Sequence, residues 1–355
     1  MASAVTERQI GELIRRCYVG LDADQLRSEV LRRLRPIVSI DAAFFATVDP
    51  GTLLFTSALA EEPLGTATPM FLDNEFGQDD VNKFVSLAEG SDQVGSLDHA
   101  TQGERHTSQR YRDVMSPMQL GDELRAALVI KGRCWGVLCL HRAQSPHGFS
   151  EGEIRLVRRL APHIAEGLRR AVVLGSAQRT LTGGTGVGIV LLDEGLSLVS
   201  MNPAAELWLD EITNGTGTEL QDDLPIALYA AAARLATADQ SATDLSSDVR
   251  LRTGSGAWLT LRASHLYGKD GRQTAVVLEP ATSAEMSSMV LDAHGLTPAQ
   301  ERVAGLVLRG HSTKEIVDQL HISANTVQEH LGAVFEKFGV RSRRELVALL
   351  LGRPH

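Results

Sequence analysis

The sequence has few cysteines, few aromatic residues and no long hydrophobic run. It contains three cysteines among 355 residues, and aromatic residues make up 5% of the chain. A sparse and odd set of cysteines argues against a disulfide framework and is typical of a reducing compartment. No stretch approaches the roughly 18 consecutive apolar residues that a membrane-spanning helix requires. Residues 1–17 carry early charges and no apolar run, so we expect no secretory signal.

The sequence also lacks an overall positive charge, since its formal net charge is −9. Residues 291–355 differ from the rest, because they carry eight Lys/Arg and seven Asp/Glu and are net +1. The preceding part carries 27 basic and 37 acidic residues and is therefore net −10. A composition with 43% hydrophobic and 22% charged residues is typical of a globular chain with room for two or three domains.

Motifs of catalysis and metal binding are missing as well. The glycine-rich segment 183–188 lacks the Lys-Ser/Thr of a phosphate-binding loop, and we interpret it as a flexible linker. No GxSxG motif occurs, and the acidic pattern of a phosphorylated receiver domain is not apparent. Cys134 and Cys139 lie five apart on a predicted strand, point to opposite faces and cannot chelate one ion together. We therefore predict no enzyme activity, no metal site and no cofactor.

The most informative stretch is 296–351, which has the periodicity of four short helices. Thr297 followed by proline begins the first helix, and Gly310 ends it. Ser312 or Thr313 caps the second helix, and a three-residue break leads to a third helix capped by Ser323. This helix–tight turn–helix arrangement is the one that places its second helix in the major groove of DNA.

The third helix of this segment has two chemically different faces. Apolar residues recur at helical spacing and predict a buried stripe, formed by Val327, Leu331, Val334, Phe335 and Phe338. The opposite side carries Asn325, Gln328, Glu329, Gly332 and Glu336. Glutamine can pair with adenine, and glutamate can accept a hydrogen bond from the cytosine amino group. A glycine in mid-helix costs about 1 kcal/mol relative to alanine, and here it leaves the backbone open to close approach.

This segment resembles the DNA-binding domain of LuxR/FixJ-type transcription regulators. Four pieces in the same order carry the resemblance: LTPAQERV, STKEI, ISANTV and GVRSRRELV. The resemblance implies a groove-facing set of Asn325, Thr326, Gln328, Glu329 and Gly332. It also implies phosphate contacts from Lys314, His330, Lys337 and Arg341, and pairing of two subunits through the last helix, 343–351. The family pattern TVKxH reads TVQEH here, so Gln328 replaces a lysine and Glu329 adds a negative charge. A module with a net charge of only +1 should bind DNA weakly as a monomer, which favours a dimer on two half-sites.

The N-terminal half has a recognisable order of predicted elements. Residues 6–17 form a helix, and Asp22 or Asp24 caps a second that ends near Arg35. Asp-Pro-Gly joins two strands, 43–48 and 52–57, and Lys-Gly-Arg joins two more, 125–130 and 135–141. One helix is expected within 79–88, and Ser150 caps a long one that Pro162 should kink. Over about residues 20–175 this order, with WGVLCLHR and FSEGEIRLVRRLAPHIA, resembles a GAF domain.

A second set of predicted strands and helices follows. Its strands are 189–192, 196–201, 248–252, 257–264 and 273–279, and its helices are 203–209 and 225–236. Over about residues 184–280 this order, with VSMNPAAELWL at its front, resembles a PAS domain. The pattern of an acyl-homoserine-lactone pocket does not appear, and Trp135, Trp208 and Trp258 lie on elements predicted to form core. Residues 282–295 are small and polar and predict a tether.

These observations predict a multidomain chain with two α+β sensory domains and an all-α four-helix helix-turn-helix domain. The predicted bounds are 1–180 for the GAF-like domain, 184–280 for the PAS-like domain, 281–295 for the linker and 296–355 for the DNA-binding domain. We expect a cytoplasmic transcription regulator that binds double-stranded DNA as a homodimer, under control of an unidentified small molecule or partner, with no membrane contact. The alternative is a protein-interaction regulator with weak or no DNA binding, which Gln328, Glu329 and the low net charge favour.

Overall fold

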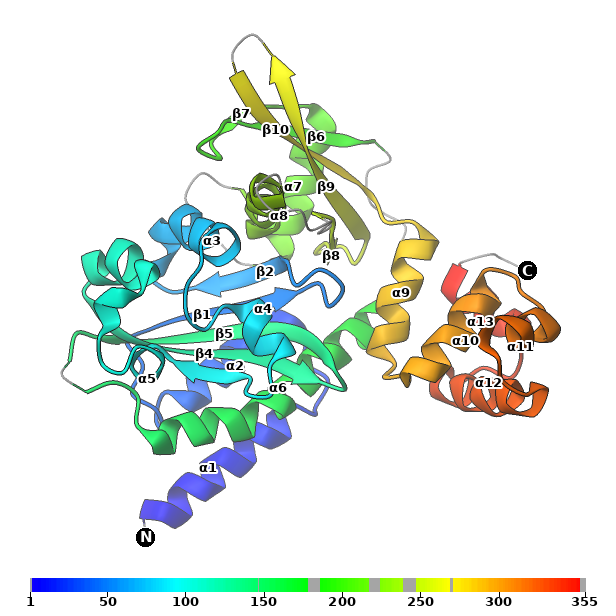
Figure 1. Cartoon of the computed structure of the whole chain (residues 1–355), viewed down its shortest axis with the longest axis horizontal. Coiled ribbons are helices and arrows are strands. Elements are labelled where there is room, and N and C mark those ends of the chain that lie inside the picture. The colour runs from blue at the N-terminus through cyan, green and yellow to red at the C-terminus, as the bar shows by residue number, and fades with distance from the viewer. Residues whose placement is uncertain are drawn as a thin grey trace. The chain divides into compact units, whose positions relative to one another are not determined.

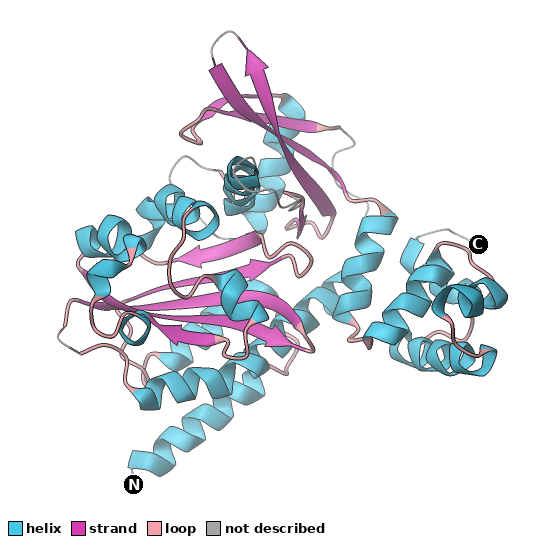
Figure 2. Cartoon of the chain, in the orientation of Figure 1, coloured by secondary structure: helices cyan, strands magenta, loops and turns pink. Residues whose placement is uncertain are grey.

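The computed structural model of the chain describes residues 2–145, 147–177, 186–216, 224–238, 247–268 and 271–351. The chain divides into two compact units, Met1–Pro280 and Ala281–His355. The described residues of the first unit contain two five-stranded antiparallel sheets, and those of the second unit are helical (Figures 1 and 2). The expected architecture of two α+β domains followed by an all-helical region is confirmed.

The first sheet has the strand order β2-β1-β5-β4-β3. Its strands are β1 (Ala42–Val48), β2 (Phe55–Ala60), β3 (Val94–Ser96), β4 (Leu120–Ile130) and β5 (Arg133–Ala143). The β4–β5 hairpin is confirmed at Lys131-Gly132, whose φ angles of 53° and 73° suit a tight hairpin turn. Strands β1 and β2 also pair as predicted, but β2 begins at Phe55 instead of Thr52 because the connection extends beyond Asp-Pro-Gly. The β4–β5 register pairs Glu123 with His141 and Arg125 with Cys139, so four polar or ionisable residues lie together on two central strands.

Helices surround this sheet: α1 (Ala2–Arg16), α2 (Ala23–Leu34), α3 (Thr68–Gly77), α4 (Phe84–Glu89), α5 (Leu97–Ala100) and α6 (Glu151–Ala177), with short turns η1 (Leu64–Ala67), η2 (Arg105–Thr107), η3 (Tyr111–Met115) and η4 (Ser116–Met118). Asp22 caps α2, since its Oδ1 accepts from the Gln25 amide at 2.8 Å. Helix α6 packs along β4 and β5 and continues through Pro162 (Figure 1).

The helix predicted within residues 79–88 begins only at Phe84, and α3 was not predicted at all. The Asp80 carboxylate explains the later start, because it accepts hydrogen bonds from the backbone amides of Val81 and Arg110 at 2.8 and 2.7 Å. A carboxylate that binds nearby amides competes with helix formation. That competition keeps the segment before Phe84 irregular.

The second sheet has the order β7-β6-β10-β9-β8. It consists of β6 (Gly188–Leu192), β7 (Leu198–Met201), β8 (Val249–Arg252), β9 (Trp258–Gly268) and β10 (Gly271–Pro280), with helices α7 (Pro203–Thr216) and α8 (Ile226–Ala238). The order is the same as in the first sheet when strands are numbered within each sheet. Trp135 and Trp208 are buried as predicted, whereas Trp258 is half-buried. Of the glycine-rich linker predicted at 183–188, residues 183–185 lie outside the described residues, and Gly188 begins β6.

Helix α8 joins the two sheets within the first unit. Its alanines 227 and 230–232 are fully buried, and the helix packs against β9 on one side and against α3 and β2 on the other. Asp49, in the β1–β2 turn, binds Arg250 of β8: Arg250 Nε and Nη2 donate to its two carboxylate oxygens at 2.7 and 2.6 Å. Asp49 is 0% exposed, so this ion pair fixes the second sheet to the first through a buried carboxylate.

The second unit contains α9 (Ser283–Ala293), α10 (Pro298–Leu308), α11 (Thr313–Leu320), α12 (Ala324–Phe338) and α13 (Arg343–Leu351). Helix α9 occupies most of the segment predicted to be a tether, and its helical structure was not predicted. Thr282 and Glu285 form a capping box at its start, and Ser287 donates to the carbonyl of Leu350 at 3.2 Å. The His294 ring stacks on Phe338 of α12, with centroids 4.0 Å apart, which attaches the end of this segment to the helical core.

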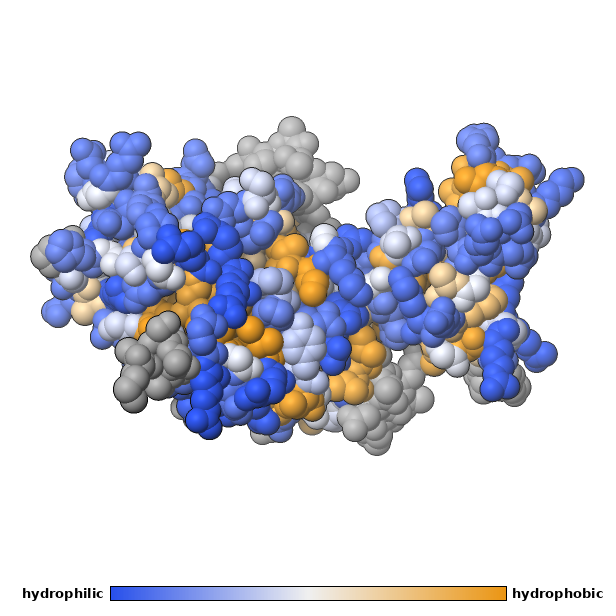
Figure 3. All heavy atoms as spheres, turned by 90° about the horizontal axis from the view of Figure 1, so that it is seen from below, coloured by the Kyte–Doolittle hydropathy of each residue, from blue (hydrophilic) through white to orange (hydrophobic). Residues whose placement is uncertain are grey.

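No helix among the described residues is long and apolar enough to cross a membrane. On the face drawn in Figure 3, hydrophobic residues form small patches between hydrophilic ones.

Candidate nucleic-acid interface and buried polar cluster

The turn between α11 and α12 is built by local hydrogen bonds. Ser312 caps α11: its Oγ accepts from the Glu315 amide at 3.3 Å, and Glu315 accepts from the Ser312 amide at 2.6 Å. His321 ends α11 in the left-handed region, with φ 54°. Ser323 then caps α12, accepting from the Thr326 amide at 3.0 Å. The predicted three-residue break is thus a tight turn that sets α12 directly after α11.

Helix α12 buries one face and exposes the other. Val327, Leu331, Val334 and Phe338 are buried in a core shared with α10, α11 and α13. Asn325, Gln328, Glu329 and Gly332 are exposed. The Asn325 amide donates to Glu329 Oε1 at 2.9 Å, and a Cβ added at Gly332 would meet no atom of the described chain within 4 Å. The structure therefore leaves an open polar helix face with hydrogen-bond donors and acceptors.

The predicted phosphate-contacting residues differ in exposure and in the partners that they already have. Lys314 and Arg341 are exposed, and neither side chain forms an ion pair within the described part of the chain. His330 is half-buried on α12. Lys337 Nζ donates to the Gly295 carbonyl and to Gln300 Oε1, both at 2.8 Å, so this ammonium connects α12 to the start of α10. Two cations are thus available to a phosphate as they stand, and the third is already engaged.

The first domain contains a buried polar cluster that the sequence did not predict. Glu123 of β4 is 0% exposed and accepts from Arg110 Nε at 2.9 Å. Arg125, also 0% exposed, donates from Nη1 to Glu75 Oε2 of α3 at 2.9 Å, and its Nε lies 3.3 Å from Glu123 Oε1. Removing one partner of a buried ion pair is strongly destabilising, so these charges depend on one another. The available signal was the pairing of Glu123-x-Arg125 with Cys139-x-His141, which puts all four on one sheet face.

Burial decides the protonation of the cluster. Burial lowers the pKa of His141 to about 4, although Glu123 opposes the shift, so the imidazole is neutral near pH 7. Burial raises the pKa of the Cys139 thiol to about 12. For Glu123, burial acts to raise the pKa, but the charges of Arg110 and Arg125 outweigh it and lower the pKa to about 2. Glu123, His141 and Cys139 are therefore a carboxylate, a neutral imidazole and a protonated thiol, and they lie beside the guanidiniums of Arg110 and Arg125.

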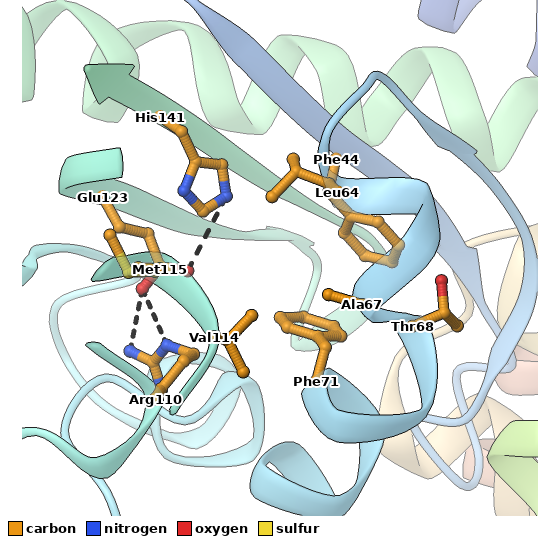
Figure 4. Close-up of a pocket in the computed structure, with 10 residues that line it drawn as sticks. All are labelled: Phe44, Leu64, Ala67, Thr68, Phe71, Arg110, Val114, Met115, Glu123 and His141. Carbon is orange, nitrogen blue, oxygen red and sulfur yellow. Dashed lines mark hydrogen bonds and ion pairs between the residues drawn. The ribbon is translucent and has the colours of Figure 1, made fainter. Parts of the chain in front are cut away.

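A cavity of about 20 Å³ adjoins this cluster (Figure 4). Its walls are largely apolar, and Arg110, Glu123 and His141 form its polar end; the other lining residues are Phe44, Leu64, Ala67, Thr68, Phe71, Val114 and Met115. Thr68 and Phe71 belong to α3, the helix that packs against α8. A cavity of this size holds about one water molecule.

Three donor atoms of the cluster could in principle bind a metal ion. Glu123, Cys139 and His141 each offer one atom, and these atoms lie within 4.8 Å of one another. However, Glu123 is bound by Arg110 and lies beside Arg125, and the thiol is protonated. A metal cation would meet two fixed positive charges and would have to displace the thiol proton. The arrangement therefore suits uncharged groups better than a metal.

Two family models match parts of the chain. The model of bacterial regulatory proteins of the LuxR family matches residues 294–350, and the GAF domain model matches residues 22–168. The spore germination protein GerE of Bacillus subtilis is 38% identical over 56 residues, 16% of this chain and 76% of that protein. The chain belongs to the LuxR family of transcription regulators and carries an N-terminal GAF domain.

Other relatives cover the chain in part. The probable HTH-type transcriptional regulator GfsR of Streptomyces halstedii is 31% identical over 86 residues, 23% of this chain, and the chain spans only 35% of that protein. A GAF domain of a phosphoenolpyruvate-protein phosphotransferase from Coxiella burnetii is 16% identical, with a TM-score of 0.35, and covers 48% of this chain and 96% of that one.

Proposed function

We propose that the chain is a sequence-specific DNA-binding transcription regulator that acts as a dimer. The observation that carries this proposal is the exposed face of α12, where Asn325, Gln328, Glu329 and Gly332 follow a tight turn after α11. An amide and a carboxylate on a helix of this kind can bind base edges in the major groove. Thr326 and the bare backbone at Gly332 complete the proposed groove-facing set.

Phosphate contacts position such a helix on the duplex. Lys314 and Arg341 are the proposed contacts, because both are exposed and without ion-pair partners among the described residues. His330 and Lys337 belong to the same proposed set, but Lys337 would first have to leave Gly295 and Gln300. Few cations per module favour a dimer, in which two modules share the phosphate neutralisation. Helix α13 can supply the contact between subunits, because Leu349 on it is 47% exposed.

The region before α9 is the proposed input part of the regulator. The GAF domain has a small cavity between α3 and the sheet, and α8 packs on α3 from the second sheet. We infer that this second domain is PAS-like, because the stretch VSMNPAAELWL forms its second strand and first helix within a five-stranded antiparallel sheet that carries two helices. A small molecule or partner of this region would then control output in a cytoplasmic protein.

The alternative is a regulator that contacts proteins and binds DNA weakly or not at all. Gln328 stands where the family pattern has a lysine, and Glu329 places a carboxylate on the same face. Salt dependence separates the two functions, since binding through phosphates weakens steeply as salt rises. A protein-binding form would recover no duplex sequence in a selection.

The experiment is selection of bound fragments from random duplex DNA with the full-length chain. We expect one enriched motif with two half-sites about one helical turn, roughly 10 base pairs, apart. A Gln319→Ala variant, altered at an exposed glutamine of α11, serves as a matched control for Gln328→Ala. If no sequence is enriched, base reading by α12 is wrong; if both variants select the same motif with equal strength, Gln328 does not read a base.

A further inference from the structure

The charges at the polar end of the GAF cavity disfavour a charged ligand. Glu123 lies between Arg110 and Arg125, and Arg125 is also bound to Glu75 at 2.9 Å. Both guanidiniums are already paired, Arg110 with Glu123 and Arg125 with Glu75, so neither a cation nor an anion placed there would find an unpaired opposite charge. Because like charges repel strongly where water is excluded, both are disfavoured. The electrostatics of the cavity therefore select an uncharged guest.

The same end presents two hydrogen-bonding atoms that one hydroxyl group beside them can bridge. His141 Nε2 lies 3.9 Å from Glu123 Oε1, too far for a direct hydrogen bond. An oxygen about 2.8 Å from each atom would close this gap, since one O–H can donate to the carboxylate while its oxygen accepts from the ring N–H. His141 Nδ1 also lacks a hydrogen-bond partner among the described residues. Figure 4 shows the ring and the carboxylate facing this end of the cavity.

The remaining walls suit an apolar body. Phe44 and Phe71 lie with ring centroids 5.1 Å apart, and Val114 and Met115 line the cavity beside them. The present volume of about 20 Å³ holds only a water-sized group, so a larger body requires Phe71 or Met115 to move. Phe71 is half-buried on α3, and Met115 has a flexible side chain.

We propose that this cavity binds a small uncharged alcohol or phenol, with its hydroxyl between His141 and Glu123 and its apolar body against Phe71 and Met115. The inference rests on the proposed input role of the GAF domain and names the chemical class of its ligand. When the apolar part of the ligand enters, it displaces the side of α3 that faces the sheet. Because α3 also packs against α8, the second sheet would respond to the ligand.

The test uses four probes of similar shape and different polarity, titrated into the full-length chain by calorimetry: benzyl alcohol, toluene, benzoate and benzylamine. The same titrations use Met115→Ala, which enlarges the cavity, and Met115→Val as a milder variant in case the first does not fold. We expect benzyl alcohol to bind at least 10-fold more tightly than the other three, and more tightly to the enlarged cavity than to the wild type. In either Met115 background, His141→Phe should remove the advantage of benzyl alcohol over toluene.

Three results would overturn the proposal. These are equal or tighter binding of a charged probe, equal binding of toluene and benzyl alcohol, and no binding of any probe to the wild type and the folded Met115 variant. The titration contains no DNA, so its failure leaves the DNA selection unaffected. Conversely, a failed selection with a positive titration would reject the DNA-binding function and keep the ligand class.

Discussion

The ion pair between Asp49 and Arg250 gives the sharpest prediction for the first unit. Arg250→Ala removes two charged hydrogen bonds, at 2.7 and 2.6 Å, and leaves a carboxylate that is 0% exposed in the intact protein. Breaking a buried pair in this way costs about 3–5 kcal/mol. The Arg250 side chain is itself 13% exposed, and Asp49 keeps the Gly51 amide at 2.8 Å, so we expect the lower end, about 3 kcal/mol.

Hydrogen exchange of the full-length chain measures this effect locally. The amides of β8 and β9 should exchange faster in Arg250→Ala, because the free energy of opening this region falls by about 3 kcal/mol. Arg272→Ala is the control, because Arg272 lies 3.9 Å from a Glu194 that is 68% exposed, and such a pair contributes under about 1 kcal/mol. Equal exchange in the two variants would refute the argument that Asp49 fixes the second sheet to the first.

Three further predictions concern the helices and the cluster. Gln328→Ala should reduce the discrimination at one base position of the selected site by about 1–3 kcal/mol, measured by competition with single-base variants. An equal loss of affinity for all variants would mean that the side chain contacts the DNA backbone instead. Leu349→Glu should raise the dimer dissociation constant in sedimentation, since it puts a charge on an exposed apolar position of α13; an unchanged constant would place the dimer contact elsewhere. Because the pKa of His141 is about 4 in the folded chain and 6.5 in the unfolded chain, protonation of His141 favours unfolding. The free energy of unfolding should therefore decrease by up to about 3 kcal/mol as pH falls from 6.5 towards 4. In urea titrations His141→Phe should therefore lose less stability than the wild type over that range, and parallel losses would contradict the shift.

The C-terminal unit was largely predictable because its signals are local. Thr297, Ser312 and Ser323 cap the helices that follow them, and the 3.6-residue period of α12 separates its buried face from its exposed face. Both hairpins of the first sheet were marked by their turn residues, Asp-Pro-Gly and Lys-Gly. Helix α9 was missed although Thr282 and Glu285 have capping-box spacing, because small polar residues around them were interpreted as a tether.

The buried cluster could not be predicted because it depends on pairing between distant segments. Arg110 lies directly before η3, Glu75 on α3, and Glu123 and Arg125 on β4, so only the fold brings their charges together. Charged residues in a sequence usually indicate solvent exposure, and nothing local marks Arg125 as fully buried. The segment between β2 and β4 is likewise organised by these long-range bonds rather than by periodicity, which explains why α3 was missed.

The dependence of DNA affinity on salt tests the central claim, that α12 and its neighbouring cations bind a duplex. Two contacts from each subunit, Lys314 and Arg341, neutralise about four phosphates in a dimer, which implies a slope of about −3.6 for log affinity against log salt. Affinity for the selected site should then fall about 150-fold between 50 and 200 mM salt. The double variant Lys314→Ala/Arg341→Ala should show a slope that is shallower by about 3.6. A flat slope in the wild type, or an unchanged slope in the double variant, would contradict the account.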